Sequence, residues 1–594
     1  MRDTIIIAVS IILAAVLITA GGLHLDHINN QRKALHLVVN EPLENIPPKL
    51  AITTAAMGAF RGLLVDILWM RAETLKEEGQ FFDAKQLAEW ITALQPRFAE
   101  VWAFHAWNMA YNISAAIPSS RPAERWRWVK NGYELLRDRG LQINPKSMVL
   151  YRELAMIFQH KIGGVSDEAH RYYKLQLALA MEPLVSPPTD EHFEKLAKAP
   201  RTLQEIMADA KVAALVAKLG KADSRFEDMD NLVSNYLSLR ENPRRFADEA
   251  FEVIDQYRGT ETLDKFDTFA KAYQLRNVWK LDPVLMQEIN HTYGPVDWRD
   301  PNAHLPLDWR HPCSHSIYWA LKGLRTAGKT GVAKGREEEY SAAEINTDRM
   351  LYHSLQDLFR AGKIFIYTAP AKAPSQPGQE PVPPRQTIYL RPDLRMFEPY
   401  NRHILKVIEK YVDPNSKELA SHQIGHRNML KNAILSFYQA GHVKQARKIY
   451  RQLRTLYPSK DFEVPLEQFV KNRFLEELKT LHIFNVRELL VMLLRESYFY
   501  YAMRQDDDAF GREKLAREIY EYYHKEFSES ERIDVPPLSK LRYVALQDFL
   551  QDRQFPPELQ RALLGRIKLE RPDLYEKLRQ QEEQLRKQLE QMRK

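Results

Sequence analysis

The amino-acid sequence predicts an all-α protein with one small β-hairpin insertion and a transmembrane helix at its N-terminus. Residues 4–23 carry no charge, and apolar residues recur at helical spacing through most of the remaining 594-residue chain. The alternation typical of strands occurs only between residues 363 and 390. We therefore expect helices that pair with one another rather than a fold built on a sheet.

Composition shifts and helix-breaking residues divide the chain into six regions. We expect an anchor (1–25), a linker (26–49), an N-terminal helical domain (50–185), a helical region without a clear repeat (186–290), a region of loops, helices and the hairpin (291–400), and a C-terminal helical domain that ends in a charged helical tail (401–594).

The anchor is predicted from the uncharged run between Thr4 and Leu23. Twenty residues at a helical rise of about 1.5 Å span the ~30 Å hydrocarbon layer, so this segment is long enough to cross a bilayer once. A cleaved signal peptide is the alternative. However, the apolar run is long for one, and the bulky Ile18 stands two residues before Ala20, where cleavage favours a small residue.

The orientation of the anchor is less constrained, because Arg2 on one side faces Arg32 and Lys33 on the other. We expect a single-pass protein of a bacterial inner membrane whose body lies outside the cytoplasm. Outside the first 25 residues, no segment approaches an uncharged run of twenty.

Helices separated by short turns recur between about Leu50 and Leu184, and again after Arg402. Two segments place the same kinds of residue at identical intervals. The first set is Leu68, Ala72, Leu75, Gly79, Ala84 and Pro96, and the second is Leu430, Ile434, Phe437, Gly441, Ala446 and Pro458. A third, shorter match aligns Gly511, Ala516 and Tyr520 with Gly441, Ala446 and Tyr450.

These positions resemble the tetratricopeptide repeat (TPR) pattern, in which small residues let two helices approach and a proline ends the second helix. The resemblance covers roughly 180 residues. It departs from the pattern at Ile434, which replaces a small residue, and at an insertion between Ile113 and Glu124. The resemblance implies a TPR-like solenoid of helical hairpins whose first helices line a concave groove that binds a partner.

Matching the repeat position by position implies which side chains line that groove. They combine aromatic groups with single charges, which suits a bound peptide or helix better than a small molecule. The implied groove residues are Trp107, Tyr111, Arg152, Met156, His160, Lys431, Leu435 and Tyr438.

A local duplication interrupts the helices between Tyr293 and Pro312, a segment that we expect to be irregular. VDWRDPNAH (296–304) and LDWRHPCSH (307–315) share an Asp-Trp-Arg triplet followed by proline and histidine at fixed spacing. The candidate metal ligands or acid and base groups in this loop are Asp297, His304, Asp308, His311 and His315, with Cys313 as a soft ligand or nucleophile. The alternative is a structural loop in which Asp caps, Arg pairs, Trp packs and His covers a helix start.

Other motifs indicate no chemistry of their own. The string GLRTAGKT (323–330) satisfies the P-loop expression, but SIYWALK before it has a helical pattern and no buried strand precedes it. We therefore expect no nucleotide. Basic and acidic residues number 85 and 78 and are interspersed, which gives no nucleic-acid footprint. A single cysteine excludes an internal disulfide and a four-cysteine zinc site.

From the sequence we expect a membrane-tethered scaffold or adaptor that binds an unidentified protein partner in an envelope-associated complex. We expect no catalytic residues, no resident metal and no cofactor. The alternative is an enzyme, such as a metal-dependent hydrolase, with its site in the duplicated Asp-Trp-Arg segment. If the histidines and aspartates of that segment converge, the enzyme is favoured; if they scatter, the adaptor is.

Overall fold

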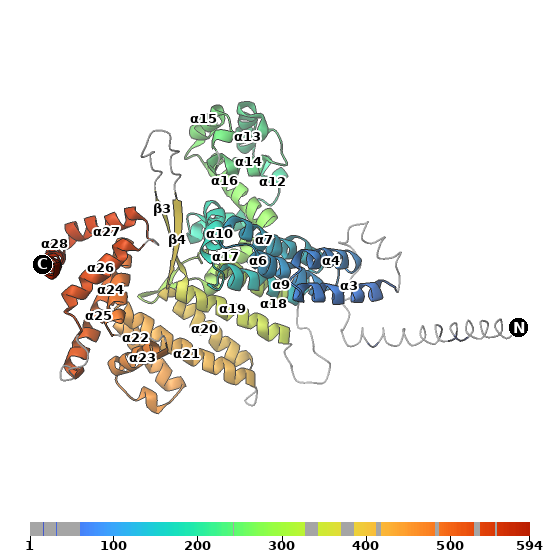
Figure 1. The fold of residues 1–594 in the computed structure, drawn as a ribbon. Coiled ribbons are helices and arrows are strands. Elements are labelled where there is room, and N and C mark those ends of the chain that lie inside the picture. Colours follow the sequence, from blue (N-terminus) through green and yellow to red (C-terminus); the bar gives the residue numbers. More distant parts are fainter. Residues whose placement is uncertain are drawn as a thin grey trace. The chain divides into compact units, whose positions relative to one another are not determined.

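The computed structural model describes residues 60–241, 243–326, 342–369, 385–411, 417–480, 486–527, 535–552 and 555–593, together with the single positions 13, 16, 19 and 31. The chain divides into two compact units. The N-terminal unit comprises Met1–Gly294 and Leu305–Asp357, and the C-terminal unit comprises Pro295–His304 and Leu358–Lys594. Both units are mainly helical (Figure 1).

The predicted membrane span between residues 4 and 23 lies almost entirely outside the described residues. Among the residues that are described, no helix combines the length and the apolarity needed to cross a membrane.

The N-terminal unit begins with a helical hairpin. α3 (Phe60–Glu77) and α4 (Phe81–Leu94) lie side by side (Figure 1), and Gly79 between them has φ of +76°. A residue with a Cβ rarely adopts this left-handed backbone, so glycine at the turn lets α4 fold back along α3. Fully buried Ala72 and Ala84 allow the close approach of the two helices.

Further helices follow in the same unit. They are α5 (Ala99–Trp107), α6 (Ser114–Ala116), α7 (Pro122–Glu134), α8 (Leu141–Ile143), α9 (Met148–Met156), α10 (His170–Val185), α11 (Asp190–Lys198), α12 (Leu203–Met207), α13 (Ala210–Ala222), α14 (Leu232–Glu241), α15 (Asp248–Tyr257), α16 (Glu261–Gln274), α17 (Pro283–Tyr293), α18 (Pro312–Thr326) and α19 (Ala342–Ala361), with the short 3₁₀ turns η4 (Ser224–Phe226) and η5 (Pro243–Arg245).

Several helices of this unit widen into π-helical turns, an arrangement that inserts a residue into the helix and is frequent at functional sites. In the described part of the chain these are η1 (Asn108–Ile113), η2 (Leu135–Gly140), η3 (Ile157–Ile162) and η6 (Leu275–Trp279). η1 follows α5 without a break, so the insertion expected after Ile113 begins as a helical extension through α6.

The helical region expected to lack a repeat has its own core. α12 to α16 lie close together (Figure 1). They enclose a cluster of apolar side chains that includes Phe226, Phe246, Phe266 and Phe269. No repeat is needed to explain this cluster, because aromatic packing between non-equivalent helices buries it.

The C-terminal unit also contains helical hairpins. α21 (Lys417–Gln439) pairs with α22 (Val443–Leu456) through Gly441, whose φ of +81° matches that of Gly79. α24 (Val486–Ala502) pairs with α25 (Asp506–Phe527). The other helices are α20 (Phe397–Lys410), α23 (Leu466–Thr480), α26 (Leu538–Gln551), α27 (Pro557–Glu570) and α28 (Pro572–Arg593), with the 3₁₀ turns η7 (Leu394–Met396) and η8 (Lys460–Phe462).

The third match in the repeat pattern was misaligned. Gly511 does not occupy a turn but lies inside α25, and the turn before that helix uses Arg504 at φ 59°. Ala509, which is buried five residues after Arg504, is therefore the equivalent of Ala446, five residues after Gly441. Gly511 has a different role, because a Cβ there would lie 2.5 Å from the carbonyl carbon of Ala440.

The described residues of the C-terminal unit include two antiparallel hairpins. β3 (Lys363–Ala369) pairs along its whole length with β4 (Arg385–Arg391), as the alternating sequence predicts. β1 (Val296–Asp297) and β2 (Asp300–His304) form a second, shorter hairpin in the segment that was expected to be irregular. The pairing of β1 covers only two residues, too few for alternation to be recognised in the sequence. The tip of the longer hairpin lies outside the described residues.

Candidate functional site

The two copies of the Asp-Trp-Arg segment belong to different units. The first copy forms the β1–β2 hairpin of the C-terminal unit, whereas the second leads into α18 of the N-terminal unit. The structure therefore does not assemble Asp297, Asp308, His311 and His315 into one site within either unit. The side chain of His304 lies outside what the structure describes.

Both copies form the same local turn. The Oδ1 atom of Asp297 accepts the backbone N–H of Arg299 at 2.9 Å, and that of Asp308 accepts the backbone N–H of Arg310 at 3.0 Å. The guanidinium of Arg310 also donates to both carboxylate oxygens of Asp308, at 2.9 and 2.7 Å. The hydrogen bond from the Arg299 backbone lowers the pKa of Asp297 below its usual value. These aspartates hold turns of their own segments.

Trp309 of the second copy is a core residue. Its side chain is 0% exposed, and its Nε1–H donates to Oδ1 of Asn290 at 2.9 Å. The same oxygen accepts the backbone N–H of Leu307 at 3.1 Å. Asn290, a buried polar residue of α17, thus fixes the path of the chain before α18.

The histidines of the second copy serve the same helix start. Nδ1 of His311 accepts the backbone N–H of Cys313 in the first turn of α18, at 3.1 Å. His315 is 0% exposed, and its Nε2 lies 3.0 Å from the carbonyl oxygen of Trp309. The ring of His315 stacks on Phe158 with centroids 4.9 Å apart.

Burial decides the ionisation of this cluster. Desolvation lowers the pKa of His315 to about 4; the hydrogen bond to the Trp309 carbonyl opposes this shift, and the charge of Arg137 adds to it. Burial raises the pKa of the Cys313 thiol well above its usual value, so the thiolate that a nucleophile or soft ligand requires is disfavoured. Within the described residues, no group of three or more His, Cys, Asp or Glu side chains is placed to hold a metal ion.

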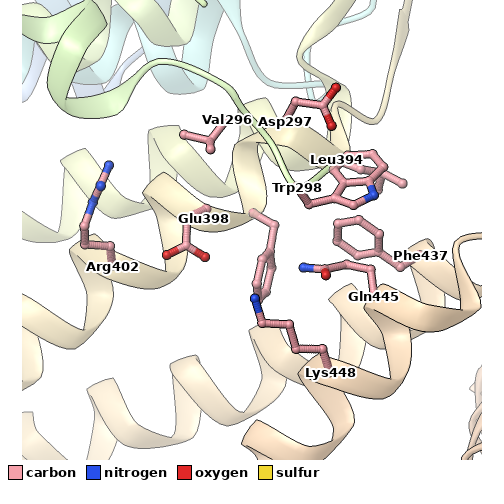
Figure 2. Close-up of a pocket in the computed structure, with 10 residues that line it drawn as sticks. Val296, Asp297, Trp298, Leu394, Glu398, Arg402, Phe437, Gln445 and Lys448 are labelled. Carbon is pink, nitrogen blue, oxygen red and sulfur yellow. The ribbon is translucent and has the colours of Figure 1, made fainter. Parts of the chain in front are cut away.

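The first copy contributes to a pocket instead. The ring of Trp298 meets Phe437 edge-on with centroids 4.9 Å apart, and His442 at 4.8 Å. Figure 2 shows Trp298 above Phe437 at one end of a hollow of about 300 Å³. The pocket is lined by Val296, Asp297, Trp298, Leu394, Phe397, Glu398, Arg402, Phe437, Gln445 and Lys448.

The lining divides into an apolar floor and a charged rim. Leu394, Phe397 and Phe437 are buried, whereas Glu398, Arg402 and Lys448 are exposed. Glu398 and Arg402 come from α20, and Gln445 and Lys448 come from α22 (Figure 2). This combination can take an apolar group with an ionic or hydrogen-bonding neighbour.

Three of the predicted groove residues form a continuous stack in the N-terminal unit. The Trp107 and Tyr111 rings lie 5.4 Å apart at an interplanar angle of 18°, and the Tyr111 and His160 rings lie 5.8 Å apart at 28°. Trp107 and Tyr111 are partly exposed and His160 is exposed. Tyr111 lies in η1 and His160 in η3, so two π-helical turns present this stack.

The stack extends onto the first helix of the unit. The ammonium of Lys76 lies 5.0 Å from the ring centroid of Trp107 and 5.4 Å from that of Phe104. Phe104 in turn contacts Trp69, with centroids 5.1 Å apart. We call this set the aromatic row, and it comprises Trp69, Lys76, Phe104, Trp107, Tyr111 and His160.

The sequence-based prediction did not include Trp69, Lys76 and Phe104. Trp69 and Lys76 are seven residues apart on α3, a spacing that places both on one face of a helix. This spacing could have identified Trp69 and Lys76 if α3 had also been matched to the repeat position by position.

The other predicted groove residues of this unit lie beside the row. The guanidinium of Arg152 donates to Glu153 at 2.8 Å, and both side chains are partly exposed. The backbone carbonyl of Met156 accepts the hydroxyl of Tyr111 at 3.4 Å. Burial raises the pKa of Tyr111 above its usual value, so the hydroxyl remains a donor at neutral pH.

The predicted groove residues of α21 are largely engaged inside the C-terminal unit. Leu435 is only 6% exposed and packs within this unit rather than lining an open surface. The hydroxyl of Tyr438 donates to Glu518 at 3.1 Å, and Lys431 lies 5.2 Å from the ring centroid of Phe462. These side chains therefore hold neighbouring helices of the C-terminal unit to α21.

Comparison with known proteins does not extend these observations, since no family model matches the chain and no curated protein matches it significantly.

Proposed function

We propose that this chain is a membrane-tethered adaptor of TPR-like helical hairpins that binds a protein partner along the aromatic row of its N-terminal unit. The uncharged run between Thr4 and Leu23 supports the tether, and the localisation proposed with it is a bacterial inner membrane with the body outside the cytoplasm. The TPR-like architecture is supported by two hairpins that share spacing, a buried alanine five residues after the turn and a left-handed glycine at the turn.

The aromatic row is the observation that carries the proposal. Its members come from α3, from α5 with η1, and from η3, so successive helical segments contribute to one surface. Partly exposed aromatic side chains that a monomer leaves in contact with water are typical anchors of protein interfaces. A row of them suits an elongated partner segment, such as a helix or extended peptide.

The aromatic row also carries a positively charged side chain. Lys76 lies over Trp107 and Phe104 and forms no ion pair among the residues that the structure describes, and the exposed His160 ends the row. A cation held against aromatic faces remains able to pair with a carboxylate of a partner. The row thus combines apolar contact area with a positive group near its centre.

Crosslinking in intact membranes tests the proposal. The double variant Lys76→Ala/His160→Ala should lower the yield of the captured partner at least tenfold while leaving the melting temperature within a few degrees, since both side chains lie at the surface. The control Lys130→Ala/Lys211→Ala removes two exposed cations, one from α7 and one from α13, that do not belong to the row. Unchanged capture by the first variant, or an equal loss in the control, would show that the row is not the binding surface.

A further inference from the structure

α22 of the C-terminal unit carries an unusual concentration of positive charge. Its fourteen residues include five basic side chains and no acidic one. The five are Lys444, Arg447, Lys448, Arg451 and Arg454, and all are exposed. The opposite face of the helix is buried through Ala446, Ile449, Tyr450 and Leu453.

Stability does not explain this charge distribution. Lys444 and Lys448 are four residues apart, as are Arg447 and Arg451, and like charges at that spacing destabilise a helix. Arg447 pairs with Glu467 at 3.2 Å. Lys444, Lys448 and Arg451 have no ion pair among the residues that the structure describes. Three cations on one face of α22 are thus available to an external anion.

The pocket beside Trp298 adjoins this face. Lys448 belongs both to the basic face and to the pocket lining, and Gln445 of the same helix also lines the pocket (Figure 2). The volume of about 300 Å³ is at the lower end for ligand sites. Its floor of Trp298, Leu394, Phe397 and Phe437 suits a large apolar side chain.

We infer that this surface is the docking site for an acidic segment of a partner protein. One large apolar side chain of that segment enters the pocket, and its neighbouring carboxylates pair with Lys444, Lys448 and Arg451. The inference rests on the proposed adaptor function but concerns a second surface, in the other unit. The positive charges of α22 favour a negatively charged segment, and the apolar floor of the pocket favours a large apolar side chain as its anchor.

Acidic side chains in the pocket lining argue against a nucleic acid. Glu398 is exposed at the rim on the α20 side, and Asp297 also lines the pocket. A continuous phosphate backbone would meet these carboxylates, whereas a peptide can place its acids toward α22 and its apolar side chain toward the floor. The bound segment should therefore have its carboxylates on one side of its anchor.

Photocrosslinking of the full-length protein in its native membranes tests the inference. Gln445 is replaced by p-benzoylphenylalanine, and the crosslinked peptide is sequenced by mass spectrometry. The expected product is a segment of another protein that is rich in Asp or Glu and contains a large apolar residue within a few positions. A crosslink to lipid, to nucleic acid, to a second copy of this chain or to a segment without acidic residues would overturn the inference, as would the absence of any crosslink.

Charge reversal provides the second measurement. Lys444→Glu/Lys448→Glu in the photoprobe background should reduce the yield at least tenfold, and the matched double change Lys577→Glu/Lys587→Glu at exposed positions of α28 should not. Equal yields in all three backgrounds would overturn the ionic part of the inference. A second photoprobe at His160 reports on the aromatic row alone, so its success together with failure at Gln445 would reject this docking site and leave the adaptor function standing.

Discussion

Buried histidines are a feature that both units share at the level of single residues. Burial lowers the pKa values of His105, His315 and His426 to about 4. The ring of His426 is held from both sides, since Nδ1 lies 2.8 Å from the Tyr457 hydroxyl and Nε2 lies 2.8 Å from Oδ1 of Asn401. These contacts suit a neutral imidazole, with one nitrogen accepting and the other donating.

The neutral histidines predict that the protein loses stability in acid. The pKa of His315 is about 4 in the folded chain and about 6.5 when unfolded, so the unfolded chain binds the proton first as pH falls. The contribution is complete above pH 6.5 and is lost between pH 6.5 and 4. It amounts to roughly 3 kcal/mol for a fully buried ring. Urea denaturation at pH 7.5, 5.5 and 4.5 measures it.

The variant His315→Phe isolates this residue. A phenyl ring retains the stacking on Phe158, but it cannot form the hydrogen bond to the Trp309 carbonyl, so the variant should be less stable than the parent at pH 7.5. Because phenylalanine does not titrate, the variant should lose less stability on acidification. If the free energy of unfolding fell with pH equally in parent and variant, His315 would not be the source of the expected loss of stability.

Helix pairing is the part of the fold that the sequence predicted best. The equal spacing of small residues around Gly79 and Gly441 corresponds to two turns with φ of +76° and +81°. The spacing around Gly511 was misleading because the third turn uses Arg504 in a left-handed conformation, which only a few per cent of non-glycine residues adopt. A glycine pattern cannot reveal a turn that contains no glycine.

Gly511 supports a prediction about how closely the helical elements pack. Gly511→Ala should destabilise the C-terminal unit by about 1–3 kcal/mol, because the new Cβ would collide with the backbone of Ala440. Gly565→Ala is the matched control in α27, where nothing lies within 4 Å of the new atom. There alanine should stabilise by about 0.5–1 kcal/mol. Differential scanning calorimetry separates the two, and a stabilised Gly511→Ala variant would contradict the close approach.

The candidate sites were less predictable than the helices. The sequence identified Trp107, Tyr111 and His160 as one face, because repeat spacing within and between neighbouring helices determines which side chains align. It did not reveal that Trp298 and Trp309, with identical neighbours, have different surroundings. One lies in a pocket lining and the other is wholly buried. That difference depends on tertiary partners remote in the sequence, such as Phe437 and Asn290.

At the level of the whole molecule, the proposed tether leads to a test by fractionation. Removing residues 1–25 should transfer the chain from the membrane pellet to the supernatant with the cooperative unfolding of its body retained, since the helices whose bounds the structure describes begin at Phe60. The full-length chain should remain in the pellet after washing with salt and alkaline carbonate. A native N-terminus near Gly21, or release of the intact chain by salt alone, would contradict an uncleaved anchor.

The way the chain alternates between units also constrains its biosynthesis. Pro295–His304 belongs to the C-terminal unit, yet it leaves the ribosome before Leu305–Asp357, which completes the N-terminal unit. Trp298 can contact Phe437 only after about 140 more residues have been synthesised. At ~5–20 residues per second this delay is on the order of ten seconds. During translation Trp298 of the hairpin therefore lacks its partner Phe437, which makes the hairpin a candidate contact for chaperones that bind nascent chains.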